Sequence, residues 1–510
     1  MVASLLKILQ SGIQDVRLLA PKGQPKIDFF KKVFIKAGRF TTQWSRIDFD
    51  QIPDFGKSAT ITLPRQGHLI SRLYLVVNLP DIVGAQLAAQ AAATAAGQTL
   101  LGPTFGWTNS LGHVLISSAQ IDIGGSRTEV LDSQLLEVLD EFRTPLEKVT
   151  SVNRLIERYD NGFTKRTIGW DPRKRPAQVA VPLPFWFSRG DAGAFLPIDA
   201  ISTDSVRLTI NFAPIADTYV SDVITDPTIA LQLGKVYPPI LGSPFYVANS
   251  AGTFTYRGQA ASILPGITMP LIQSFGDTYL MAEYIYLDKA EANRFRLADI
   301  LLPVPQHYKI EPYDTQNFPK VSVPLRIPNP TRDLFFYAGR YEAPSYNAPF
   351  LATRDLSGAD CTVAPWWPDA SGLNAAYFTG DYVPGYSTRD SDPISDIAFI
   401  YEGRLVRYGT EVSSLFRTIL PSINQRKSPW LNRYYYNLPF GVMNGFMAPS
   451  QPSGEANLDK IRRIDLELTM APGRGCTTGT GVERFWIYIW AETYNIFRIY
   501  GGRAALMFAY

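Results

Sequence analysis

The sequence predicts an all-β protein built from two consecutive antiparallel sandwiches, with short helices and long loops between the strands. Its 38 Gly, 38 Pro, 26 Tyr and 29 Phe are typical of short strands joined by many turns. Several segments alternate apolar and polar residues with a period of two, as strands with one buried face do. The order of these segments in the first half recurs in the second, and 510 residues with 46% hydrophobic content suffice for two large cores.

The strands of the first half are predicted from alternation. Residues 206–212 (VRLTINF) alternate throughout, which predicts a strand with one buried face. Residues 59–63 and 69–79 show the same pattern. Residues 114–123 form a further predicted strand, which ends at the turn signal Gly124-Gly125.

A change of period after this turn predicts a helix. Leu131, Leu135 and Leu139 recur at every fourth position, so they share one face of a helix that begins near residue 129 and ends at Pro145. The first half therefore contains a strand, a glycine turn and a short helix in that order.

The second half repeats this order. Residues 279–287 are predicted to be its opening strand, and residues 321–327 a further strand. Residues 396–408 form a strand, a glycine-containing turn and a second strand. A short helix-like stretch at 411–420 follows and ends at Pro421, as the helix of the first half ends at a proline.

Two late strands differ in their expected burial. Residues 464–470 alternate, which predicts one buried face. Residues 485–494 (FWIYIWAETY) are apolar on both faces. A strand of this kind lies deep in the core or is covered by another domain or subunit, and we expect it to be covered on both sides.

Composition divides the chain into four parts. We expect an arm with a short amphipathic helix at 1–24, a first sandwich at 25–215, a linker at 216–262 and a second sandwich at 263–510. The arm either packs on its own or a neighbouring subunit or contacts a membrane surface, and its low positive charge favours packing. No apolar run reaches the roughly 18 residues of a membrane helix, and the N-terminus lacks the unbroken apolar stretch of a signal peptide. We therefore expect neither membrane spanning nor secretion by that route.

Two stretches are too long for ordinary hairpins. Residues 80–106 are rich in Ala, Gly and Gln, and residues 341–395 are rich in Pro, Gly, Tyr and Asp. Loops of this length in a compact domain usually have a function. Both are expected to project from the same end of the molecule, because they join corresponding strands of the two sandwiches.

The charge balance argues against a nucleic-acid coat. Lys and Arg total 49 and Asp and Glu total 46, which gives a net charge of +3. A strongly basic surface is therefore excluded, and no specific nucleic acid is expected as a partner. The one short basic run, at 173–175, lies between two prolines and is expected to be a solvated loop.

No catalytic, cofactor-binding or metal-binding residue is predicted. Cys361 and Cys476 cannot form a disulfide framework in a chain of this size. His68, His113 and His307 are far apart in the sequence, and each is expected at a strand end or in the core rather than as a base or ligand. Carboxylates are plentiful, so a glycosidase pair stays open, but we expect no enzyme and no cofactor.

Several short segments, taken in order, resemble those of one family. In the first half they are Gln14-Asp15-Val16, Ile27-Asp28-Phe29-Phe30-Lys31, Asp54-Phe55-Gly56-Lys57, Gly112-His113-Val114-Leu115-Ile116, Ile121-Asp122-Ile123-Gly124-Gly125, Pro182-Leu183-Pro184-Phe185-Trp186-Phe187-Ser188-Arg189 and Leu196-Pro197. In the second half they are Glu283-Tyr284-Ile285-Tyr286-Leu287-Asp288, Gln451-Pro452-Ser453-Gly454 with Asn457, Tyr494-Asn495-Ile496-Phe497-Arg498-Ile499 and Gly501-Gly502. The chain resembles the double jelly-roll major capsid proteins of large nucleocytoplasmic double-stranded DNA viruses from about residue 12 to its end.

This resemblance implies a fold and a structural role. The fold would be two consecutive eight-stranded antiparallel jelly-roll sandwiches. Three chains would form a homotrimer with a pseudo-hexagonal outline, which tiles an icosahedral shell with neighbouring capsomers and minor capsid proteins. The protein would lie in the virion and assemble in the host cell cytoplasm, and the N-terminal arm is the segment that could reach an internal membrane.

Two alternatives belong to other classes. A two-domain β-sandwich that binds or acts on carbohydrate is favoured by the aromatic residues of 341–395, because aromatic faces stack on sugars. A minor shell component such as a vertex protein needs only one sandwich, so the duplicated pattern argues against it.

Overall fold

The computed structural model describes most of both halves of the chain. The described residues are 40–81, 105–158, 178–221, 274–341, 392–429 without 404, 433–442, 453–471 and 484–508, the short strands at 27–28, 31–32, 246–248, 253–256 and 259–262, and a few single positions. The predicted arm at 1–24, most of the predicted loops 80–106 and 341–395, the basic run and both cysteines lie outside the described residues.

The first sandwich consists of two four-stranded antiparallel sheets. Their strand orders are β3-β15-β5-β9 and β4-β10-β7-β8. The strands are β3 (Phe40–Asp48), β4 (Ser58–Thr62), β5 (Leu69–Asn78), β7 (Ile116–Ile123), β8 (Ser126–Asp132), β9 (Gln178–Pro182), β10 (Val206–Phe212) and β15 (Thr278–Leu287).

The second sandwich has the same plan. Its sheets have the orders β16-β24-β18-β21 and β17-β23-β19-β20. The strands are β16 (Ile300–Asp314), β17 (Lys320–Leu325), β18 (Pro330–Arg340), β19 (Ile394–Tyr401), β20 (Leu405–Val412), β21 (Tyr435–Pro439), β23 (Ile464–Met470) and β24 (Phe485–Tyr500), and β22 (Ala456–Asn457) and β25 (Arg503–Leu506) extend the first of these sheets. When the eight strands of each sandwich are numbered in chain order, strands with the same number occupy the same position in their sheets. The prediction of two eight-stranded jelly rolls is therefore confirmed.

Shorter elements join the strands. The helices are α3 (Leu111–Leu115), α4 (Ser133–Arg143), α5 (Val149–Ile156), α7 (Lys289–Leu297), the π-helical turn η8 (Leu415–Ile419) and α9 (Leu420–Asn424), with 3-10 turns at η2 (Leu146–Lys148), η3 (Ala192–Ala194), η4 (Ile198–Ala200), η5 (Ile215–Asp217) and η9 (Leu458–Lys460). The small sheets are β1 (Ile27–Asp28) with β2 (Lys31–Lys32), β6 (Phe105–Trp107) with β11 (Tyr219–Ser221), and β12 (Tyr246–Ala248) with β13 (Thr253–Tyr256) and β14 (Gln259–Ser262). The last three strands and β11 lie within the predicted linker 216–262.

One strand lies in the other sandwich from the one expected. Residues 279–287, predicted to open the second sandwich, form β15, which pairs with β3 and β5 of the first. Alternation identifies the strand, but only long-range pairing decides its sheet. The placement of β15 corrects that strand assignment, and the division of the chain at 216–262 stays a prediction.

Both predicted helices are shifted along the chain. Residues 126–132 continue as β8, and α4 begins only at Ser133, because the Asp132 carboxylate accepts a hydrogen bond from the Leu135 backbone N at 2.7 Å and caps the helix. The second helix does not end at Pro421, which lies in the first turn of α9. A proline there leaves no helical hydrogen bond unmade, so the helix continues to Asn424.

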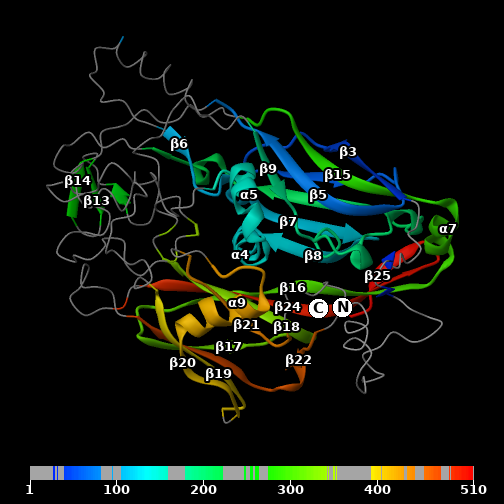
Figure 1. Ribbon diagram of the computed structural model, residues 1–510. Helices are drawn as coiled ribbons and strands as arrows, with labels where there is room; N and C mark the ends of the chain where they lie inside the picture. Colours follow the sequence, from blue (N-terminus) through cyan, green and yellow to red (C-terminus); the bar gives the residue numbers. More distant parts are fainter. Residues whose placement is uncertain are drawn as a thin grey trace, which may run out of the picture.

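The four sheets stack as layers, and the sheet β16-β24-β18-β21 lies in the interior of the stack (Figure 1). One face of this sheet packs on β17-β23-β19-β20, and the other faces the first sandwich. Ile489 and Trp490, neighbours on β24 that point to opposite faces, are each 1% exposed. The predicted burial of this strand on both sides is confirmed.

The C-terminal hairpin fastens one sandwich to the other. The turn Gly501-Gly502 joins β24 to β25, and the Thr203 backbone N of the first sandwich donates to the Gly502 carbonyl at 2.9 Å. The Asp204 carboxylate accepts from the Ala504 backbone N at 3.0 Å. Both turn glycines have positive φ, +59° at Gly501 and +80° at Gly502.

We expect Gly502→Ala to lower the free energy of unfolding by about 2 kcal/mol, because a Cβ there is strained and would overlap the Ser202 hydroxyl. Gly501→Ala is the matched control. A Cβ at Gly501 meets nothing within 4 Å, so only the backbone strain of about 1 kcal/mol remains. Urea unfolding measures the free energy of unfolding of each variant. Equal losses would show that a Cβ at position 502 does not clash with Ser202.

Candidate functional site

Buried charged groups and aromatic rings meet where the two sandwiches are in contact. Aromatic rings form the apolar part of this contact. Phe142 of α4 lies 5.4 Å from Phe335 of β18, and Trp186, which follows β9, lies 5.0 Å from Phe497 of β24, measured between ring centroids. All four side chains are buried. The two sandwiches therefore share a continuous core.

A first group of charges, the sheet cluster, crosses this contact at β24. The Glu492 carboxylate accepts from Arg143 Nη2 at 2.5 Å and from Arg189 Nη1 at 2.8 Å, and both arginines belong to the first sandwich. Arg189 Nη2 also donates to Glu129 of β8 at 2.8 Å. Each buried carboxylate thus has a cation from the first sandwich, which is the condition for burying charge without a large penalty.

His307 of β16 completes the sheet cluster. Its Nδ1 lies 3.0 Å from Glu129 Oε1 and 3.1 Å from Arg189 Nη2, so one tautomer of the neutral ring donates to the carboxylate and the other accepts from the guanidinium. Burial, and then the positive charge of Arg189, lower the pKa of His307 below its ordinary value. The neutral ring therefore joins the two sandwiches by a hydrogen bond rather than by an ion pair.

Two carboxylates of the sheet cluster are directly opposite one another. Asp333 of β18 and Glu492 of β24 are register partners, and both are fully buried. Burial and the neighbouring Glu492 charge raise the pKa of Asp333 to about 6, although Arg332 and Arg143 oppose the shift. Burial would also raise the pKa of Glu492, but Arg143, Arg332 and Arg189 outweigh it and hold that pKa below its ordinary value. Below about pH 6 the pair therefore keeps its charge mainly on Glu492, and above it both carboxylates are ionised.

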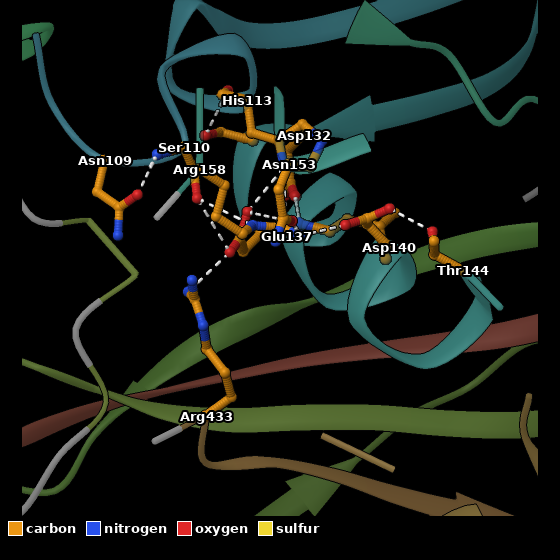
Figure 2. A network of polar contacts seen from close by, with 12 residues as sticks. Asn109, Ser110, His113, Asp132, Glu137, Asp140, Thr144, Asn153, Arg158 and Arg433 are labelled. Atoms are coloured by element: carbon orange, nitrogen blue, oxygen red, sulfur yellow. Dashed lines mark hydrogen bonds and ion pairs between the residues drawn. The ribbon is translucent and has the colours of Figure 1, made fainter. Parts of the chain in front are cut away.

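A second group of charges, the helix cluster, lies around α4 (Figure 2). Its centre is Glu137, fully buried on α4. The Glu137 carboxylate accepts from Arg158 Nη2 at 2.5 Å, from His113 Nδ1 at 2.7 Å and from Arg433 Nη1 at 2.8 Å. Arg433 belongs to the second sandwich and precedes β21, and in Figure 2 it reaches Glu137 from below. One carboxylate thus holds three elements of the chain together.

The charges of the helix cluster stabilise one another. Burial would raise the pKa of Glu137, but Arg158 and Arg433 outweigh burial, so the pKa lies well below its ordinary value. Burial would likewise raise the pKa of Asp140, and Arg158, which donates to it, lowers it instead. A further pair, Lys427 Nζ and Glu141 at 3.1 Å, crosses to the second sandwich.

The structure does not bring the three histidines together. His113 is in the helix cluster and His307 is in the sheet cluster. His68 lies elsewhere, and its Nδ1 accepts from the Leu287 backbone N at 2.8 Å. His113 and His307 are buried and His68 directly precedes β5, which agrees with the predicted core and strand-end positions. That the chain has no catalytic or ligand residue stays a prediction.

Neither charge cluster was predicted from the sequence. Arg189 and Glu492 are 303 residues apart, and Glu137 and Arg433 are 296 apart, so no local spacing could join them. In the parts of the chain that the structure describes, no three His, Cys, Asp or Glu side chains are grouped as a metal site would require. The described helices include none with the length and apolar character needed to cross a bilayer.

Comparison with known proteins gives the fold a family context. Residues 28–243 match the family described as major capsid protein N-terminus. A probable capsid protein 4 of Acanthamoeba polyphaga mimivirus is 28% identical over 266 residues, which are 51% of this chain and 46% of that protein. The major capsid protein of Rana tigrina ranavirus is 22% identical over 480 residues, 88% of this chain and 86% of the relative. The chain thus spans about half the length of the first relative and most of the second.

A solved structure extends the likeness to the whole fold. The capsid structure of the virus PBCV-1 superposes with a TM-score of 0.65 at 17% identity and covers 95% of this chain and 100% of its own. The family match covers the first sandwich except β15, the ranavirus protein aligns with both sandwiches, and the superposition extends over the two jelly rolls. In sequence and in fold, the chain is therefore similar to the double jelly-roll major capsid proteins of nucleocytoplasmic large DNA viruses.

Proposed function

We propose that the chain is a major capsid protein, three copies of which form a pseudo-hexagonal capsomer that tiles an icosahedral virus shell. The observation that carries the proposal is the pair of jelly rolls with one strand order, fastened side by side by buried charges. Three such chains around a threefold axis present six similar sandwiches, which is the outline of a hexagon.

The clusters between the sandwiches suit a shell component. A building block that tiles must hold its two halves at a fixed angle, because an error in that angle is repeated in every neighbour. Buried pairs such as Arg189 with Glu492 fix orientation, since any rotation would leave a charge unpaired in the interior. The partners proposed are two further copies, neighbouring capsomers and minor capsid proteins, and the location is the virion shell, with assembly in the host cytoplasm.

The mass of the purified protein in solution tests the proposal. One chain has a mass of 56.8 kDa, so three give about 170 kDa. Light scattering after size exclusion should give the trimer mass, and negative-stain images should show hexagon-like outlines. A stable monomer at high concentration that binds glycans would instead favour the carbohydrate-binding alternative.

A further inference from the structure

The two jelly rolls correspond residue by residue at their matching sheets. In the first, Glu283 of β15 pairs with Arg72 of β5, and the register then skips Ser71. In the second, Glu492 of β24 pairs with Asp333 of β18, and the register skips Arg332. Because both bulges fall at the same place, Glu283 occupies the position of Glu492.

Further equivalent positions in the two sheets follow from aligning the two bulges. Counting two residues on from Arg72 and Asp333, Tyr74 of β5 takes the place of Phe335 of β18. Trp44 of β3 faces Glu283 as His307 of β16 faces Glu492. The outer faces of the sheets β3-β15-β5-β9 and β16-β24-β18-β21 are therefore equivalent surfaces.

Among the residues that the structure describes, only one of these two equivalent faces is covered. The first sandwich covers β16-β24-β18-β21, and α4 sets Phe142 against Phe335. The outer face of β3-β15-β5-β9 lies on the outside of the layered stack (Figure 1). Trp44 is 43% exposed there and meets Tyr74 edge to face at 5.7 Å, and Met281 beside them is half-buried.

The element that would cover such a face is also present, and one side of it is exposed in the part of the chain that the structure describes. The helical segment η8–α9 follows β20 as α4 follows β8. Counting back from the helix ends at Arg143 and Asn424, Ile423 takes the place of Phe142. Phe142 is fully buried, whereas Ile423 is 56% exposed, and Ile419 one turn earlier is also exposed.

We propose that η8–α9 of one copy docks on the outer face of β3-β15-β5-β9 of a second copy, with Ile423 against Tyr74 and Trp44. The contact repeats between chains the one that α4 makes within the chain. Alternating the two contacts around three copies brings six sandwiches into one closed ring, so no face of this kind stays uncovered. The inference rests on the proposed trimer and names its contact surfaces.

The contact between copies differs in chemistry from the contact within the chain. Arg143, which donates to Glu492, is replaced by Asn424 at the equivalent helix end. Glu283 already has partners in its own chain, since Ser71 Oγ donates to it at 2.7 Å and Arg72 lies 3.5 Å away. The contact between copies therefore lacks an equivalent of the Arg143–Glu492 ion pair, and the half-exposed Arg46 and Arg72 border its apolar part.

Single substitutions on each surface test the inference in the full-length protein. Ile423→Glu and Trp44→Glu each place a charge in the apolar contact, and we expect each to weaken trimer formation by at least about 30-fold, the loss typical of a central interface residue. Ile52→Glu is the matched control, because Ile52 is 88% exposed and lies in the segment between β3 and β4. Mass photometry across a dilution series measures the trimer fraction, and thermal unfolding by circular dichroism verifies the fold.

A double variant distinguishes the loss of a direct contact between positions 423 and 44 from a general loss of folding or stability. Ile423→Glu combined with Trp44→Lys should regain trimer, because each copy then offers a cation to the carboxylate of the next. A wild-type protein that is monomeric would contradict the proposed function itself. A wild-type trimer that both single variants leave intact would overturn only the assignment of these surfaces, as would trimer loss in Ile52→Glu to the same extent.

Discussion

Replacing Glu137 by glutamine is expected to lower the free energy of unfolding by about 3–5 kcal/mol, the loss typical of breaking a buried ion pair. Glutamine keeps the shape of the side chain but removes its charge. Arg158 and Arg433 would then lie buried beside one another without the carboxylate that now accepts from both. Equilibrium unfolding in guanidinium chloride at neutral pH measures the loss.

The pH dependence of this loss provides a second measurement. The pKa of Glu137 is depressed in the folded protein, so the stability that its charge contributes is present above the ordinary value of 4.5 and is lost as the pH falls below it. The difference between wild type and Glu137→Gln should therefore shrink in acid. The exposed Glu147 supplies the control, since Glu147→Gln should change stability by less than about 0.5 kcal/mol. A small effect at Glu137 at neutral pH would mean that the arginines find other partners.

Replacing Asp333 by asparagine is expected to stabilise the protein at pH 7.5 by about 3 kcal/mol. The pKa of Asp333 is raised from 3.8 to about 6 by burial and by Glu492, and a pKa difference of about 2 corresponds to about 3 kcal/mol. The folded protein binds this proton more tightly than the unfolded chain does. Stability is therefore lost as the pH rises from about 4 to about 6, and asparagine, which does not ionise, avoids that loss.

Asparagine can also keep the local hydrogen bonds. Its side-chain oxygen can accept from Asn437 Nδ2, which now lies 3.1 Å from Asp333 Oδ1. Chemical unfolding at a series of pH values between 4 and 8 should give a gain that is largest above pH 6 and close to zero near pH 4. Asp459→Asn at an exposed position is the control. A gain that does not vary with pH would contradict the raised pKa as its cause.

Strands with one buried face could be predicted from the sequence alone. Residues 206–212 and 464–470 form β10 and β23 with the expected bounds, because alternation along a strand directly records which face meets the core. The apolar run at 485–494 correctly indicated cover on both sides, although β24 continues to Tyr500. Local pattern thus determines which segments are strands and how they are buried.

Pairing between distant segments could not be predicted in this way. The sheet that receives residues 279–287 depends on hydrogen bonds to strands more than two hundred residues earlier, and no property of the segment itself records them. The charge clusters have the same origin. Arg143 and Glu492 look like ordinary solvated charges in the sequence and become partners only when the sandwiches pack.

The place of β15 has a consequence for how the protein is made. This strand lies between β3 and β5, so it is a central strand of its sheet and not an edge. A nascent chain that has left the ribosome only as far as β14 still lacks it, and the two flanking strands then have no neighbour between them. The N-terminal jelly roll can therefore close only after synthesis has passed Leu287, and an expressed fragment that stops at the predicted linker would not be an independent folding unit.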